Sequence, residues 1–252
     1  MKRQNLRKGI LLLSFLTVPL TQFYFSPYLI IDGASQGILV GSALTFGFLL
    51  IGSIFLGRAF CGWIMPCGGL QEACFLANDR KVPGGKFNRI KFILWVPWIA
   101  TILFFFIGAG GVRAIDPLYK TYFGISISEP WMYWIYYGVI SIFVLLSFLI
   151  GRRASCHYIC WISPFMIVGR KIRNSLKLPA LQLSLTGNQC VHCHRCTKVC
   201  PMSLNVEKMV EAKFLENSEC ILCASCVDAC KKQVLALSVG CPKSSSFTSV
   251  GA

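Results

Sequence analysis

Four long apolar runs, separated by short polar segments, dominate the first 150 positions of the chain. None of the four contains a charged residue, and each approaches or exceeds the roughly 20 residues that a helix needs to cross a bilayer. Two of them contain a proline, which a membrane helix tolerates when neighbouring groups bond the freed carbonyl. The pattern therefore predicts four transmembrane helices, over residues 10–31, 38–56, 92–111 and 131–150.

Composition divides the chain into a membrane part and a smaller soluble part. Of the 252 residues, 55% are hydrophobic and only 14% are charged, which is too apolar for an ordinary soluble domain. The apolar runs lie before residue 151, whereas most of the 14 cysteines lie after it. We expect a transmembrane domain over 1–178 with two cysteine loops, 57–74 and 151–161, then a soluble domain over 179–242 and a flexible tail over 243–252.

Lysine and arginine residues gather in three segments that the four predicted helices place on one side of a membrane. The N-terminus carries four of them, and segments 57–91 and 151–178 carry six each, whereas 32–37 carries none and 112–130 carries two. Because basic residues are enriched in cytoplasmic loops, we expect a multi-pass protein of the cytoplasmic (cell) membrane with both termini in the cytoplasm. This distribution also accounts for the net charge of +15 without a nucleic-acid partner.

The first apolar run also follows basic residues, as the core of a secretory signal peptide does. The run is longer than such a core, however, and no A-x-A-like cleavage site follows it. We therefore expect this run to be retained as a helix.

Two cysteine motifs in the C-terminal region share the spacing C-x2-C-x2-C-x3-C. Bacterial ferredoxins use this run for [4Fe–4S] clusters: three neighbouring cysteines hold one cluster and the fourth ligates the other. Zinc also uses C-x2-C pairs, but three closely spaced cysteines followed by a fourth are not a zinc pattern. The motifs predict two clusters, one held by Cys190, Cys193, Cys196 and Cys230, the other by Cys220, Cys223, Cys226 and Cys200.

The second motif differs from the first after its last cysteine. Cys200 is followed by Pro201, as in ferredoxins, whereas Cys230 is followed by Lys231. A later Cys–Pro pair begins at Cys241, so this residue is either an alternative fourth ligand or a spare thiol.

Another group of cysteines follows the second and fourth predicted helices. Aligning Cys61 with Cys156 also pairs Arg58 with Arg153, which indicates two parallel repeats of two helices and a cysteine loop. Arginine lowers the pKa of a nearby thiol and favours the thiolate that binds metal, so a third cluster or a set of redox thiols is one interpretation. The other is that the thiols pack as small apolar side chains. The candidate third site comprises Cys61, Cys67, Cys156 and Cys160, with Cys74 as a spare thiol.

These patterns predict an α-helical membrane protein with four transmembrane helices in two parallel two-helix repeats, followed by a C-terminal ferredoxin-like α+β domain with two [4Fe–4S] clusters. The combination of loops 61–68 and 156–160 with the ferredoxin run resembles the NapH, NosR and CcoG superfamily of polyferredoxin membrane proteins, over about residues 7–232. The loops of that family have the pattern C-x3-C-P. Here Met65 stands in place of a cysteine and Trp161 in place of a proline.

The resemblance implies electron transfer between the quinone pool, or a cytoplasmic donor, and a redox partner protein. Because other members serve in metal-centre assembly or regulation, a membrane metal or thiol reductase and a redox sensor stay open as alternatives, as does a quinol dehydrogenase or reductase subunit.

Other redox cofactors have no motif in the chain. The three histidines, His157, His192 and His194, lie outside the predicted helices, which argues against haem b within the bilayer. Neither the C-x-x-C-H run of haem c nor the G-x-G-x-x-G run of nicotinamide-binding folds is present. We therefore expect no haem and no nicotinamide cofactor.

Overall fold

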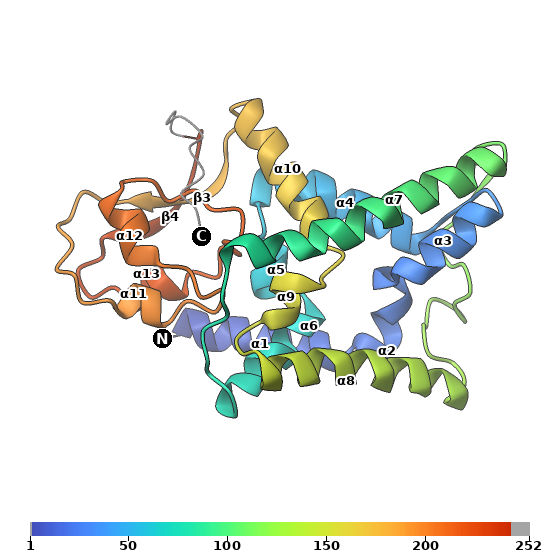
Figure 1. Cartoon of the computed structure of the whole chain (residues 1–252), viewed down its shortest axis with the longest axis horizontal. Helices are drawn as coiled ribbons and strands as arrows, with labels where there is room; N and C mark the ends of the chain where they lie inside the picture. Colours follow the sequence, from blue (N-terminus) through green and yellow to red (C-terminus); the bar gives the residue numbers. More distant parts are fainter. Residues whose placement is uncertain (1, 243–252) are drawn as a thin grey trace.

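The computed structural model describes residues 2–242, and its apolar half forms helices that run along the long axis of the molecule (Figure 1). The helices that follow this axis most clearly are α1 (Lys2–Leu16), α4 (Gly41–Leu56), α7 (Ile90–Gly108) and α8 (Tyr133–Leu149). The predicted tail over 243–252 lies outside the described residues.

Two helical stretches in the described residues are long and apolar enough to cross a membrane, Phe87–Gly108 and Pro130–Leu149. They contain α7 and α8, each preceded by a short 3-10 turn, η3 (Gly85–Arg89) and η4 (Pro130–Met132). Their outer faces expose large apolar side chains, such as Ile107 at 78% and Trp134 at 82%. Apolar surface on this scale requires lipid or a partner to cover it. The predicted helices over 92–111 and 131–150 are therefore present.

The first apolar run is not one straight helix, so its elements differ from the single helix predicted over 10–31. After α1 the chain bends by 59° into the stretch formed by α2 (Val18–Thr21) and η1 (Gln22–Phe25), and α3 (Pro27–Ser35) follows. Proline starts α3 because it has no N–H to satisfy and its fixed backbone angle suits the first turn. The Ser26 hydroxyl caps the same helix by accepting the Leu29 N–H.

The second apolar run also starts differently from the prediction. Residues 38–40 form strand β1 (Ile38–Val40), which pairs in parallel with β2 (Ala114–Asp116). Because residues 38–40 belong to this strand, the helix that follows, α4, has only 16 residues and is about 24 Å long. That is shorter than a hydrocarbon core of about 30 Å, so the predicted span over 38–56 is wrong in its first turn.

The two cysteine loops fold alike. Helix α4 leads into α5 (Ala59–Trp63) and α6 (Pro66–Ala73), and α8 leads into α9 (Ala154–Tyr158) and α10 (Ser163–Ser175). In the first loop the Cys61 N–H donates to the Arg58 carbonyl at 3.0 Å. In the second loop the Cys156 N–H donates to the Arg153 carbonyl, also at 3.0 Å. Helix α6 packs on α1 and α8, while α10 packs on α4 and α7.

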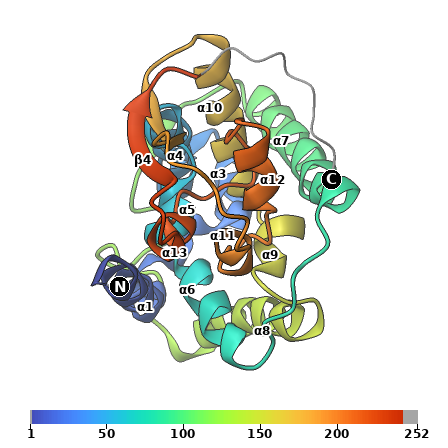
Figure 2. The ribbon, with the colours of Figure 1, turned by 90° about the vertical axis from the view of Figure 1, so that its left-hand side faces the viewer.

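The C-terminal unit is a small α+β domain at one end of the molecule (Figure 1). Its first and last strands, β3 (Ala180–Leu185) and β4 (Leu235–Gly240), pair antiparallel with Ala180 opposite Gly240. Three short helices lie between them, α11 (Arg195–Lys198), α12 (Val206–Glu211) and α13 (Ser225–Ala229). Figure 2 shows these helices in front of the cysteine loops when the molecule is viewed from this end.

Ion pairs connect the C-terminal unit to the helical part of the molecule. The Glu219 carboxylate accepts from Arg58 at 2.9 Å and from Lys91 at 2.6 Å, and Glu216 pairs with Arg170 at 2.6 Å. Although burial alone would raise the pKa of Glu219, the charges of Arg58 and Lys91 hold it down at about 2. The carboxylate is therefore ionised at neutral pH and connects three separate elements.

Candidate metal centres

One set of four cysteines lines a cavity at the outer end of the C-terminal unit. Cys190 and Cys193 lie in the loop before α11, Cys196 lies in α11, and Cys230 directly follows α13. We call these four the distal set. The same cavity is lined by Glu207 and Val234 and by several basic residues, among them Arg195, Lys231 and Lys232.

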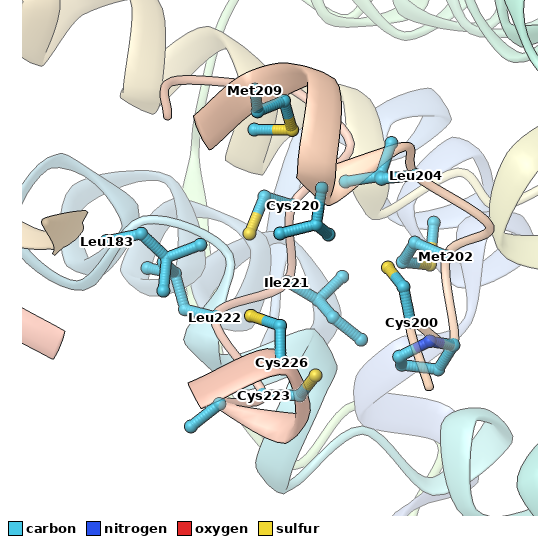
Figure 3. Close-up of a pocket in the computed structure, with 13 residues that line it drawn as sticks. Leu183, Cys200, Met202, Leu204, Met209, Cys220, Ile221, Leu222, Cys223 and Cys226 are labelled. Atoms are coloured by element: carbon cyan, nitrogen blue, oxygen red, sulfur yellow. The ribbon is translucent and has the colours of Figure 1, made fainter. Parts of the chain in front are cut away.

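The other four ferredoxin-motif cysteines surround a second, largely apolar cavity, and we call Cys200, Cys220, Cys223 and Cys226 the proximal set. Figure 3 shows them among the side chains of Leu183, Met202, Leu204, Met209, Ile221 and Leu222. Burial raises the pKa of the Cys200 thiol to about 11 and that of Cys220 to about 12. The thiolates that a metal requires therefore depend here on the positive charge of the metal itself.

The two motifs have the same backbone conformation. His192 and His194 have φ angles of 50° and 56°, and the equivalent Leu222 and Ala224 have 49° and 61°. These left-handed residues alternate with the cysteines and curl each loop around its cavity. In both motifs the fourth cysteine lies at the cavity of the other loop.

Cys241 lies outside both cavities. It follows β4 and is exposed, whereas Cys230 lines the distal cavity although Lys231 follows it. Of the two sequence-based candidates for the fourth position, the geometry therefore brings Cys230 to the other three thiols.

The cysteines of the two loops gather between the helices, and we call Cys61, Cys67, Cys156 and Cys160 the loop set. Cys61, Cys156 and Cys160 are buried, and Cys67 is partly buried. Burial is the main cause of the raised pKa of Cys61, Cys67 and Cys160, and the nearby Cys156 thiol adds to it in each case. The fifth thiol of the loops, Cys74, is buried at the end of α6.

Two side chains that the sequence analysis did not identify contact the loop set. The Met166 sulfur lies 3.2 Å from the Cys61 sulfur, and Gln71 Nε2 lies 3.4 Å from the Cys156 sulfur. Both contacts join residues far apart in the sequence, so no local motif could have revealed them.

The expected effect of arginine on these thiols is outweighed by burial. Burial raises the pKa of Cys61 above its ordinary value, although Arg58 and Arg153 act in the opposite direction. Burial likewise raises the pKa of Cys160 to about 12. The arginines act on Cys61 in the expected direction, but the desolvation of its buried thiol has the larger effect on the pKa.

Arg58 and Arg153 nevertheless place positive charge beside the loop set. Arg153 is fully buried, donates to the Cys61 carbonyl at 2.7 Å and pairs with Glu72 at 2.5 Å. Arg7 on α1 pairs with the same Glu72 at 2.7 Å. Among the described residues, Arg58 Nε and Nη2 and Arg153 Nε are buried without a hydrogen-bond partner. Unpaired donors of this kind destabilise a protein unless an acceptor is bound beside them.

The loop set lies directly beside the proximal set. A Cβ on Gly62 would meet the Ile221 carbonyl oxygen at 2.3 Å, so only glycine allows this approach. Trp63 Nε1 donates to the Leu222 carbonyl at 3.1 Å, and Arg152 donates to the Cys200 carbonyl at 3.3 Å. The loop set and the cysteines of the proximal set are therefore held by touching segments.

A group of non-sulfur donors lies at the distal set. His192 Nδ1 is 3.2 Å from Glu207 and 3.1 Å from Glu211, and His194 also contacts Glu207. Ligand atoms of His192, Glu207 and Glu211 lie within 4.8 Å of one another. These contacts engage both carboxylates of α12.

Comparison with protein families agrees with this arrangement. A model described as a 4Fe–4S dicluster domain matches residues 189–235, which include both ferredoxin motifs. A second model, described as a 4Fe–4S binding domain, matches twice, over 39–87 and 131–179, and each match includes one cysteine loop. The chain therefore contains 4Fe–4S ferredoxin domains.

Several curated proteins are similar to the chain. An uncharacterized protein of Methanocaldococcus jannaschii is 28% identical over 210 residues, covering 78% of this chain and 79% of that protein. YccM of Escherichia coli, provisionally named for electron transport, is 24% identical over 220 residues, covering 81% of this chain and 57% of its own length. The methylamine utilization ferredoxin-type protein MauN of Methylorubrum extorquens is 28% identical over 173 residues, which cover 64% of this chain and 53% of MauN. No solved structure matches the chain.

These matches confirm the resemblance found in the sequence. The chain contains 4Fe–4S ferredoxin domains and is similar to polyferredoxin-like membrane proteins of the NapH and FixG type.

Proposed function

We propose that this protein carries electrons between the quinone pool of the cytoplasmic membrane and a soluble redox partner. The distal set would hold one [4Fe–4S] cluster and the proximal set a second. When bound, each cluster supplies a one-electron redox couple. The observation that carries the proposal is the order of the three cysteine sets, which run from the exposed Cys193 to thiols enclosed between apolar helices.

The loop set is proposed to hold a third iron–sulfur cluster. Its four sulfurs come from two loops of similar fold, and buried guanidinium N–H groups of Arg58 and Arg153 lie beside them without acceptors. An anionic thiolate-bound cluster would accept those hydrogen bonds and offset both charges. Packing of apolar thiols alone leaves the same donors unsatisfied.

The residues around the three sets have separable tasks in this proposal. Apolar side chains around the proximal set exclude water. Gly62 lets the first loop approach the Ile221 carbonyl, and Glu72 holds Arg153 beside Cys61. The short contacts between loops keep neighbouring sets close, which a chain of one-electron carriers requires.

The membrane arrangement is part of the proposal. We infer that α1 with α2, α4, α7 and α8 form four membrane segments, with α4 short because β1 precedes it. The loop 109–130 lies at the opposite end of the molecule from the N-terminus and the C-terminal unit (Figure 1). Together with the basic residues of the loops, this supports a cytoplasmic location for both termini.

Fusion of alkaline phosphatase to the C-terminus tests this orientation. We expect an inactive fusion, because the enzyme needs the periplasm to form its disulfides. A fusion after Gly111, in the loop that the proposal places outside, serves as the active control. An active C-terminal fusion with an inactive control would reverse the proposed topology.

Reduction of the protein by quinol tests the electron-transfer function itself. In vesicles prepared without oxygen, addition of a reduced quinol, or of dithionite as a positive control, should bleach the visible absorption of the oxidised clusters. Bleaching by dithionite without any bleaching by quinol would exclude the quinone pool as donor. The iron–sulfur assignment would survive that result.

A further inference from the structure

We propose that the surface around the distal set docks an acidic, soluble one-electron carrier protein. This surface, which we call the basic face, consists of the exposed side chains Arg195, Lys231 and Lys232, which line the distal cavity together with Cys193. The inference rests on the proposed function and deepens it, because it names the chemistry of the redox partner.

The charges of the C-terminal unit are distributed unequally between its two sides. Residues 179–242 contain six Lys or Arg and five Asp or Glu. Three of the five carboxylates, Glu216, Glu219 and Asp228, pair with arginine or lysine of the membrane part, and the other two, Glu207 and Glu211, contact histidines. None of the six cations forms an ion pair within residues 2–242. The free surface of the unit is therefore positive.

The basic face has the layout of an interface for a transient partner. Val191, which is 56% exposed, lines the distal cavity, and the cations of the basic face line the same cavity around it. Protein interfaces commonly combine an apolar centre with a polar, accessible rim. Within the eight ferredoxin-motif cysteines, Cys193 alone is exposed, so the distal set is the one a soluble protein can approach.

The position of the basic face favours a protein partner over anionic lipids of the membrane. Helix α11 and the loop before it lie at the end of the molecule opposite α3 and the 109–130 loop (Figure 1). With the helices in a bilayer, this end points away from the membrane that holds the protein. Anionic lipids attract basic residues only within about a Debye length of their surface, roughly 8 Å at physiological salt. A soluble acidic protein, in contrast, can reach the basic face at any distance from the membrane.

Carbodiimide cross-linking gives a test that is independent of enzyme activity, because the reagent joins a lysine amine to a carboxylate in contact with it. The full chain is mixed with a plant-type ferredoxin, which is an acidic carrier, or with mitochondrial cytochrome c, which is a basic one. We expect cross-links to ferredoxin that map to Lys231 or Lys232, and none to cytochrome c. Stopped-flow measurement of the second-order rate of electron transfer from reduced ferredoxin provides the kinetic readout.

Two matched double variants test which lysines are needed for docking of the carrier. Lys231→Gln/Lys232→Gln removes two cations that line the distal cavity, and Lys208→Gln/Lys213→Gln removes two exposed, unpaired cations of the same unit that do not. We expect the first variant to lose the cross-link and to slow electron transfer by about tenfold at low ionic strength, with the difference disappearing in high salt. Iron content should be unchanged in both variants.

Equal loss in the two variants, or cross-linking of cytochrome c in place of ferredoxin, would overturn the basic face as a docking site. Either result, obtained with protein that contains its iron and is bleached by quinol, would leave the proposed function standing. Protein without iron or sulfide would instead contradict the proposed function, whatever the cross-linking shows.

Discussion

Replacing Cys156 by serine is expected to lower the iron content from about twelve to about eight ions per chain, as loss of one cubane of four irons requires. Cys156 is near the other three thiols of the loop set, because it contributes to the raised pKa of each of them. We also expect quinol to lose its ability to bleach the two remaining clusters, because the loop set lies between them and the membrane helices. Iron and sulfide analysis and quinol reduction in vesicles measure the two effects.

Cys74→Ser is the matched control for this variant. Cys74 is also a buried cysteine of the first loop, and its thiol pKa is raised by burial alone, without coupling to another thiol. We expect it to keep full iron content and quinol reduction. If Cys156→Ser behaves like Cys74→Ser in both assays, the thiols of the loop set only pack between helices.

Replacing Glu219 by glutamine is expected to be the most destabilising change to the contact between the C-terminal unit and the helices. The variant keeps the shape of the side chain but leaves Arg58 and Lys91, both buried, without their counter-charge. Removing one partner of a buried ion pair costs about 3–5 kcal/mol. For a chain of this size we expect the unfolding midpoint to fall by roughly 10 °C.

Thermal unfolding in detergent measures this effect, and Glu211→Gln is the control. Glu211 belongs to the same unit but is 48% exposed and contacts only His192. Its replacement should change the free energy of unfolding by no more than about 0.5 kcal/mol. A midpoint for Glu219→Gln equal to that of Glu211→Gln would show that Glu219 does not fasten the two parts.

The wild-type contact also has a predicted pH dependence. The pKa of Glu219 in the folded protein is about 2, below its ordinary value of 4.5, so folding favours the ionised form. Its contribution to stability is complete above the unfolded pKa and is lost as the pH falls through the folded pKa. The advantage of wild type over Glu219→Gln should therefore narrow below about pH 4.

Local patterns in the sequence predict the parts of the fold that depend on neighbouring residues. The ferredoxin motifs are of this kind, because the conformation that curls each loop is set within a few residues of His192 or Leu222. Helices α7 and α8 follow from uninterrupted apolar runs. The repeat of the two loops is visible as a repeated order of residue types, with Arg58 and Arg153 at matching positions.

The parts that sequence could not predict depend on distant residues. Helix α4 starts late because Ile38 pairs with Ala114, which lies after α7. The Cys61 thiol is harder to ionise than the neighbouring arginines suggested, because burial depends on the whole fold. Glu219 could not be recognised as the link between the two parts, since its partners Arg58 and Lys91 are more than a hundred positions away.

The measurement that tests the account most directly is a determination of iron, acid-labile sulfide and zinc in the full chain purified without oxygen. The Cys156→Ser variant is the best sample, because only the distal and proximal sets then remain to bind clusters. The account predicts about eight iron and eight sulfide ions per chain, as two cubanes require, and no stoichiometric zinc. Stoichiometric zinc without sulfide would contradict it.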